Sequence, residues 1–363
     1  MLDTFSFKKL DFLLIALVCA LNYCGLLAIR HAAPDLYRRQ LLGFIIGAAL
    51  MLVVSVFDYH YILKLHWLLY AAAIALLVLV LSVGSSGGGA QRWISLFGIT
   101  FQPSEAAKIL LILFFAEFII RYRQRMVLPL HLAACIALIL PPVYLIYKEP
   151  DLSTSIMVIL IFCVMIFTGG LEWPIVVATL AAVIPSFLWV IHEAVQGDSR
   201  ILSEYQQNRI LAWLHPESFA DSTAYQTINS MTAIGSGGLY GRGSQEVNSL
   251  LNTGYISESQ TDFIFTVIGE TFGFIGCCAV ILLIFLITFK CFLIAARAAD
   301  GQGRIIAAGM GSWIGFQSFL NIGVATGLLP NTGIPLPFVS YGLTSLVCLY
   351  AGIGFVLNVR MQE

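Results

Sequence analysis

The residues that could do chemistry in this sequence are ionisable side chains at the ends of apolar runs, and they form four groups. The first contains Arg92, Gln102 and a helix start at Ser104. Ser104 is a good N-cap, and Glu105 then lies in the first turn, where the helix dipole favours an anion. Glu105 and Lys108 can pair on one helix face, and Arg92 adds an anion-binding group upstream. The pattern is typical either of a capped helix with an ordinary ion pair or of an anion site.

The next two groups also allow a structural and a functional interpretation. Asp151 stands just before an apolar run, where it could cap a helix or belong to a site. Residues 234–243 are rich in glycine and include Arg242. Their glycine order does not match a dinucleotide-binding loop, and no strand precedes them. They are either a flexible turn or a segment whose backbone N–H groups meet a phosphate, helped by Arg242.

The fourth group runs from Glu258 through Thr261 to Asp262, and Glu270 follows eight residues later. A helix rises about 1.5 Å per residue, so Glu270 would lie about 12 Å deeper than Asp262. Asp262 could be a helix cap. A carboxylate as deep as Glu270 must face a partner or a polar cavity. Arg209 precedes this group in a polar segment and is a further candidate cation.

The elements that must position these residues are membrane-spanning helices. The chain has 363 residues, of which 59% are hydrophobic and 11% charged, and its mean hydropathy is +0.89. These values exclude a soluble enzyme, and a net charge of -1 gives no sign of nucleic-acid binding. We therefore expect an all-α polytopic protein surrounded by membrane lipids, a single transmembrane domain over residues 1–363. A span needs about 20 apolar residues; ten candidate runs are 11–30, 41–57, 67–84, 105–120, 130–147, 153–169, 174–192, 263–289, 304–328 and 341–359.

The distribution of Lys and Arg predicts the orientation. Ten of these residues fall on the side of the N-terminus and five in the short loops opposite, which predicts cytoplasmic termini. Residues 193–262 then form one long extracytoplasmic loop. The four groups and Arg209 all fall on this outer side. Such a collection of charges suits an amphipathic ligand with an anionic head and a lipid tail.

Several strings in this chain resemble, in their order, the SEDS family (shape, elongation, division and sporulation). The resemblance runs from about residue 90 to 355, and the glycine-rich form is closer to the rod-shape branch, RodA, than to the division branch, FtsW. The strings are Gln91-Arg92-Trp93, Gln102-Pro103-Ser104-Glu105 with Lys108, Pro150-Asp151-Leu152, Gly235-Ser236-Gly237-Gly238-Leu239, Thr261-Asp262-Phe263-Ile264-Phe265 and Pro335-Leu336-Pro337 with Val339-Ser340-Tyr341-Gly342.

The resemblance implies a peptidoglycan glycosyltransferase that polymerises lipid II on the outer face of the bacterial cytoplasmic (inner) membrane, in cell elongation and shape. It also implies a class B penicillin-binding protein, a single-span transpeptidase, as partner. The family's catalytic aspartate falls on Asp262. The sequence departs from the family pattern nearby, at Ile256, Ser257, Gln260 and Thr271.

These residues lead to a mechanistic hypothesis. Asp262 would be the general base of an inverting transfer with undecaprenyl pyrophosphate as leaving group. A divalent cation, Mg or Mn, could share the pyrophosphate, although no ligand motif is present. A lipid II flippase and a non-catalytic scaffold for the transpeptidase are the alternatives. The candidate substrate-binding residues are Arg92, Gln102, Glu105, Lys108, Asp151, Arg209, Arg242, Glu258, Thr261 and Glu270.

Overall fold

The computed structural model describes residues 9–87, 90–96, 99–123, 128–149, 151–170, 189, 192–193, 195, 204–243 and 259–363. Its helices confirm the all-α membrane architecture, because seven of those described are long and apolar enough to cross a membrane. Nine of the ten expected runs are helical, and the run at 174–192 falls almost entirely outside the described residues. The helices are α1 (Phe12–Ala32), α2 (Tyr37–Val56), α3 (Tyr59–Leu63), α4 (His66–Val83), α5 (Pro103–Arg123), α6 (Leu128–Lys148), α7 (Leu152–Thr168), α9 (Glu204–Leu214), α10 (Tyr225–Ser236), α11 (Ile264–Arg297), α12 (Gly301–Ala325) and α13 (Leu343–Met361).

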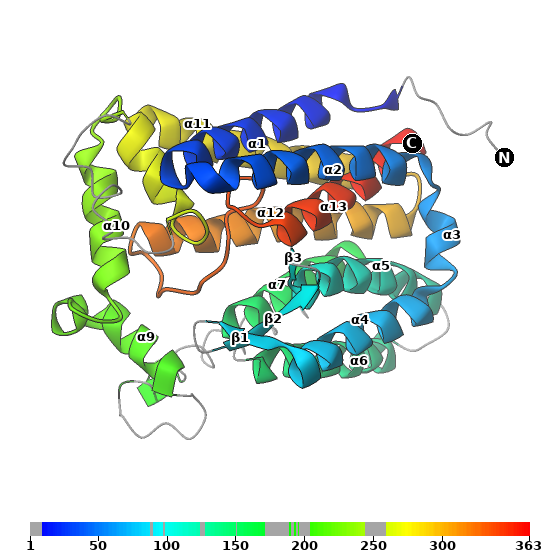
Figure 1. Ribbon diagram of the computed structural model, residues 1–363. Coiled ribbons are helices and arrows are strands. Elements are labelled where there is room, and N and C mark those ends of the chain that lie inside the picture. The colour runs from blue at the N-terminus through cyan, green and yellow to red at the C-terminus, as the bar shows by residue number, and fades with distance from the viewer. Residues whose placement is uncertain are drawn as a thin grey trace.

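The long helices form two groups joined by α12 (Figure 1). In one group α2 packs on α13, and α11 packs on α1 and α12; in the other, α4 packs on α5 and α6 on α7. α12 contacts α5 and α7 and so connects the groups. α11, α12 and α13 run in alternating directions, and α9 and α10 lie across one end of the bundle, with α3 at the other. We call these the α9–α10 end and the α3 end.

A small antiparallel sheet connects α4 to α5, an element that the all-helical expectation did not include. Its strands are β1 (Ser85–Gly87), β2 (Ala90–Leu96) and β3 (Ile99–Phe101), in the order β1-β2-β3. The register pairs Ile94 with Phe101. Arg92 lies on the central strand β2, at an irregularity where the β1–β2 register passes from Gln91 to Trp93.

Two helix starts show which of the expected helix caps are present. Asp151 caps α7, because its Oδ1 accepts a hydrogen bond from the Thr154 N–H at 3.1 Å. The expected N-cap at Ser104 is wrong, since α5 begins one residue earlier, at Pro103. Proline suits the first helical position because its missing N–H would be unpaired there anyway. Ser104 then lies inside the helix, and its buried hydroxyl has no hydrogen-bond partner.

A polar clasp closes the α3 end of the bundle. His60 lies between two carboxylates, with Nδ1 2.7 Å from Asp58 and Nε2 2.7 Å from Asp300. Tyr59 donates a hydrogen bond to the same Asp300 carboxylate at 2.7 Å. Gln362, just after α13, donates to Asp58 at 3.0 Å. The clasp therefore ties α3, the α11–α12 turn and the C-terminal helix together.

The clasp predicts a pH-dependent stability. Partial burial alone would lower the pKa of His60, but the hydrogen bonds to Asp58 and Asp300 raise it overall. The stabilisation is therefore complete below the usual histidine pKa and is lost as the pH rises through the raised value. We expect His60→Gln to lower the apparent Tm in detergent by more at pH 6 than at pH 9. Equal Tm losses at both pH values would contradict a protonated His60.

Candidate active site

A buried ion pair lies at the centre of the candidate site. Nζ of Lys108 is 2.6 Å from Oε1 of Glu105, and both residues are at most 3% exposed. Lys108 also donates to Oε1 of Gln317 at 3.0 Å and lies 4.5 Å from the Trp313 ring centre. The other oxygen of Glu105 accepts from Ser345 at 2.9 Å. The expected pairing at a three-residue spacing is thus present, and each charge has further polar partners in place of water.

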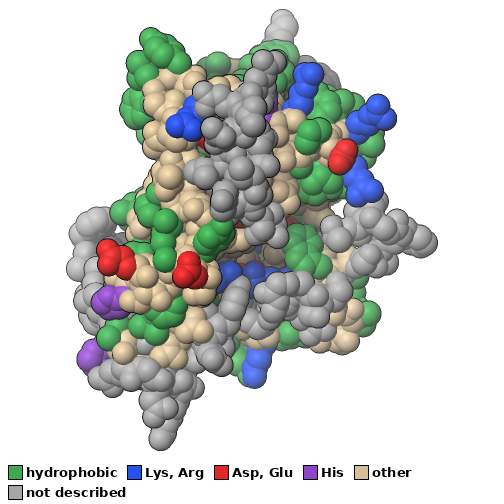
Figure 2. Space-filling model, turned by 60° about the vertical axis from the view of Figure 1, so that its left-hand side comes forward, with side chains coloured by type: hydrophobic (Ala, Val, Ile, Leu, Met, Phe, Trp, Pro, Cys, Tyr) green, Lys and Arg blue, Asp and Glu red, His purple; other side chains and the backbone are tan. Residues whose placement is uncertain are grey.

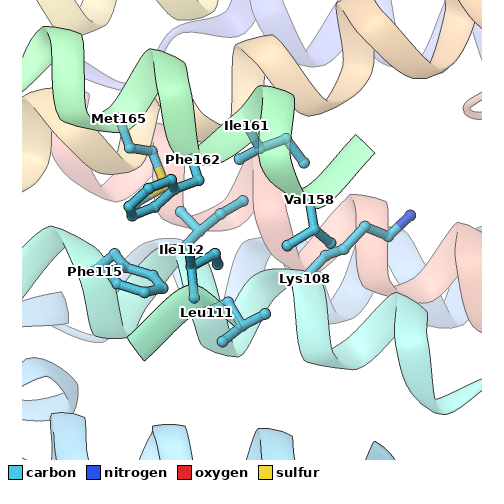
Figure 3. A pocket seen from close by; sticks show the side chains of 9 residues that line it. Lys108, Leu111, Ile112, Phe115, Val158, Ile161, Phe162 and Met165 are labelled. Atoms are coloured by element: carbon cyan, nitrogen blue, oxygen red, sulfur yellow. The ribbon is translucent and has the colours of Figure 1, made fainter. Parts of the chain in front are cut away.

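The aliphatic stem of Lys108 and its ammonium group lie in different surroundings. Apolar side chains of α5 and α7 surround the aliphatic stem, and Figure 3 shows the nitrogen directed away from them. A lysine commonly buries its methylene groups in this way while its ammonium meets polar partners. The ammonium consequently points toward α12 and its amide side chains.

Two buried amides on α12 join the ion pair to the loop between α12 and α13. Gln317 donates to the carbonyl oxygen of Pro335 at 2.9 Å. One turn later, Asn321 donates to the carbonyl oxygens of Ile334 and Asp262, both at 2.7 Å. Neither amide was among the site residues expected from the sequence. Their signal was available: two polar side chains four residues apart within an apolar run lie on one helix face and need buried partners.

Asp262 lies beside this loop and does not cap a helix. The N-cap of α11 is Phe263, and no side chain caps the helix. A Cβ added to Gly333 would lie 3.3 Å from Oδ2 of Asp262 and 3.9 Å from Nη1 of Arg209. The carboxylate and the guanidinium therefore face the same point of the α12–α13 loop. Asp262 is half-buried.

The same loop is held from both sides by backbone contacts. Ser340 donates to the carbonyl oxygen of Thr261 at 2.6 Å, and the Tyr341 N–H donates to Gln260 at 2.8 Å. Arg209 of α9 donates to the carbonyl oxygen of Asn331 at 3.1 Å. The position of Asp262 is thus set by the loop, by α12 and by α9 together. Thr261 contributes its backbone carbonyl to this arrangement.

Arg92 and Asp151 form a second charged group at the joint between α6 and α7. Nε of Arg92 is 3.6 Å from Oδ2 of Asp151 and donates to the carbonyl oxygen of Glu149 at 3.4 Å. Asp151 is therefore both a helix cap and an ion-pair partner. Burial, and next the charge of Asp151, raise the pKa of Glu149 to about 8, while the charge of Arg92 acts in the opposite direction.

The glycine-rich segment packs backbone to backbone on α11. α11 is interrupted at Gly273, where φ is 67°, and the segment crosses the break. The N–H groups of Arg242 and Gly243 donate to α11, so they are not available to a phosphate as the sequence had suggested. The four hydrogen bonds run from Arg242 to Glu270 (2.9 Å), Gly243 to Thr271 (3.2 Å), Phe274 to Gly238 (2.9 Å) and Ile275 to Leu239 (3.2 Å).

The other expected residues are distributed around these contacts. The Arg242 side chain is exposed and donates through Nε to Ser236 at 2.9 Å. Glu270 is buried in α11, as its depth predicted, and Gln102 is half-buried directly before α5. Glu258 lies outside the described residues. Figure 2 turns the α9–α10 end forward and shows Lys and Arg side chains recessed near the middle of this face.

The candidate metal ion has little support from the side chains that are described. Across the described parts of the chain, no three His, Cys, Asp or Glu side chains are grouped so that they could hold a metal ion. The eight cysteines are free thiols inside or beside helices. The described polar side chains of the site are acidic, basic, amide and hydroxyl groups.

The packing of the glycine-rich segment predicts a sharp difference between two neighbouring glycines. A Cβ on Gly237 would overlap the carbonyl oxygen of Gly269, whereas a Cβ on Gly235 would meet nothing within 4 Å. We expect Gly237→Ala to cost about 1–3 kcal/mol of stability, because backbone atoms must move. Gly235→Ala is the matched control and should leave the apparent Tm unchanged or slightly higher. Equal Tm values for the two variants would refute the close packing.

Known proteins are similar in sequence to this chain over most of its length. The family model for the cell cycle proteins FtsW, RodA and SpoVE matches residues 5–363. The peptidoglycan glycosyltransferase MrdB of Escherichia coli strain K12 is 38% identical over 302 residues, which cover 81% of this chain and 77% of that protein. A probable peptidoglycan glycosyltransferase FtsW of Enterococcus hirae is 32% identical over 375 residues, which cover 98% of this chain and 93% of that protein.

Solved structures share the fold as well. A chain from a structure described as "Structural coordination of polymerization and crosslinking by a peptidoglycan synthase complex" aligns with a TM-score of 0.78 at 30% identity, covering 96% of this chain and 97% of its own length. The crystal structure of the Thermus thermophilus rod shape determining protein RodA aligns with a TM-score of 0.71 at 30% identity, covering 96% of each chain. This chain therefore belongs to the FtsW, RodA and SpoVE family of cell cycle proteins.

Proposed function

We propose that this chain, a membrane-embedded peptidoglycan glycosyltransferase, polymerises lipid II with Asp262 as the general base. The observation that carries this proposal is one connected network at the α9–α10 end. Asn321 and Gln317 of α12 link the backbone of Asp262 to the buried Lys108–Glu105 pair through adjacent carbonyls of one loop. A fixed carboxylate close to fixed cations is what a transfer between a hydroxyl acceptor and a pyrophosphate donor requires.

The reaction follows from the roles that these groups can take. Asp262 accepts the proton of the acceptor 4-hydroxyl while that oxygen attacks C1 of the donor sugar. The bond from C1 to the pyrophosphate breaks, so the α-linked donor gives a β-linked product. Undecaprenyl pyrophosphate leaves as a stable anion, which makes a second carboxylate unnecessary, unlike in glycosidases. General base catalysis of this kind contributes about 10²–10⁴ in rate.

The cations stabilise the charge that develops on the leaving group. Arg209 faces the same loop position as Asp262, and Arg92 on the central strand of the sheet is oriented by Asp151. Lys108 adds a buried positive charge, held in place by Glu105 and Gln317. A guanidinium can bind two phosphate oxygens at once, which favours Arg209 and Arg92 as the direct contacts.

The distribution of Lys and Arg supports an orientation in the bacterial inner membrane. We infer that the α9–α10 end faces outward and that both termini are cytoplasmic. The excess of Lys and Arg at the α3 side favours this orientation, because positive residues remain inside. In this arrangement α9 and α10, the described helices of the long outer segment, lie at the outer mouth of the site.

We infer that a class B penicillin-binding protein is the partner and that its single transmembrane helix packs between α11 and α12. A groove between these helices is lined by Ile284, Phe285, Thr288, Gly315, Ser318 and Phe319. Small residues on α12 allow a helix to approach closely, and two exposed phenylalanines flank them. A similar chain occurs in a structure described as a peptidoglycan synthase complex.

The first test is the loss of polymerisation on changing Asp262. We expect Asp262→Asn, co-purified with its class B partner, to lose about 10²–10⁴ of the rate of glycan-chain formation from purified lipid II while still binding lipid II. Asp221→Asn removes an exposed carboxylate from the same outer segment and should keep full activity. A fully active Asp262→Asn would refute the assignment. Lipid II flipping without any polymerisation would support the transporter alternative.

The partner groove gives a second test. Phe285 and Phe319 are 59% and 57% exposed, so changing both to Ala should leave folding intact but reduce co-purification of the partner. Leu42→Ala with Ile46→Ala changes two α2 side chains that are each 57% exposed and serves as the control. Equal partner yield from both double variants would place the partner's helix elsewhere.

A further inference from the structure

Glu149 is an anomaly that the proposed reaction does not use. It lies just beyond the end of α6, its side chain is fully buried, and neither carboxylate oxygen has a hydrogen-bond partner among the described residues. Its backbone is engaged on both sides: the carbonyl oxygen accepts from Nε of Arg92 at 3.4 Å, and the N–H donates to the carbonyl oxygen of Ile146 at 3.1 Å. A buried carboxylate that is charged but unpaired is very costly, so such a group normally takes up a proton instead.

The charges that act on Glu149 are those of its immediate neighbours. Asp151 on α7 disfavours a second negative charge, and Arg92 on β2 favours one. Arg92 is already 3.6 Å from the Asp151 carboxylate. A neutral Glu149 therefore leaves one cation balanced against one anion. An ionised Glu149 would place two carboxylates beside one guanidinium and make the group negative overall.

We propose that Glu149 is a positioning residue that holds a proton in the active state and so keeps Arg92 attractive to the pyrophosphate of the donor. This inference rests on the proposed function, in which Arg92 contacts that pyrophosphate. The proton acts at a distance: Glu149 itself is too buried to touch the substrate. Its ionisation weakens substrate binding through charge alone, and the geometry of Asp262 does not depend on it.

The proposal predicts a change in KM rather than in kcat. Burial and Asp151 raise the pKa of Glu149 to about 8, so the residue loses its proton between neutral and alkaline pH. One additional negative charge near the anion site should raise the KM for lipid II about three- to tenfold in the wild type. Glu149→Gln keeps the shape and the neutral state, and its KM should therefore match the wild type at pH 7.

The experiment compares KM and kcat for glycan-chain formation at pH 7 and pH 9.5, using the complex with its partner. The ratio of wild-type KM to Glu149→Gln KM should rise about three- to tenfold over this interval. Other titrating groups, including Asp262, act equally in both proteins and cancel in the ratio. Glu117→Gln removes a carboxylate paired with Arg121 near the opposite end of α5 and should behave as the wild type. A constant ratio would overturn the proposal.

A second measurement separates this inference from the proposed function. Because the pKa of Glu149 is raised on folding, its contribution to stability declines as the pH rises toward that value. The apparent Tm of the wild type should therefore fall relative to that of Glu149→Gln between pH 6 and pH 9.5. A falling Tm difference with a constant KM ratio would show that Glu149 is neutral but that Arg92 does not bind the pyrophosphate. An unchanged Tm difference would refute the buried proton itself.

Discussion

The burial of one lysine constrains much of this structure. Lys108 carries a charge inside a helix bundle. Burying an ammonium there without partners would cost considerable free energy. Its partners come from two helices: Glu105 on its own helix, and Gln317 and the Trp313 ring face on α12. Ser345 then brings α13 to Glu105. Two helix groups that could otherwise slide past each other are thereby held in one alignment, and the loop that borders Asp262 inherits this alignment.

Much of the fold could be predicted from the sequence because membranes impose simple rules. Apolar runs of sufficient length predicted nine described helices, and a three-residue spacing predicted the Glu105–Lys108 pair. The cap at Ser104 was wrong, because the proline before it is a better first helical residue. The strands at 85–101 were not expected, since short polar strands have no hydropathy signal.

The partners of the site residues were much harder to predict. Gln317 and Asn321 are more than fifty residues away from the groups they hold, Lys108 and Asp262, and only the tertiary fold brings them together. The glycine-rich segment was open to several interpretations because glycine spacing alone does not say what approaches the backbone. Its true neighbour is the interrupted helix α11. Long-range pairing of this kind has no local periodicity, so sequence patterns report it only through polar residues stranded in apolar runs.

The close contact between the glycine-rich segment and α11 has a mechanical consequence. Side chains packed between two helices can change rotamer and so allow the helices to shift. Here four direct backbone hydrogen bonds, and glycines without Cβ atoms, leave no such side chains between the two segments. The first turns of α11 begin directly after the Asp262–Phe263 pair. They therefore move with α10 as one rigid unit. A protein that binds α10 outside the membrane can therefore shift the position of the Asp262 carboxylate. No change in the helices that span the bilayer is needed.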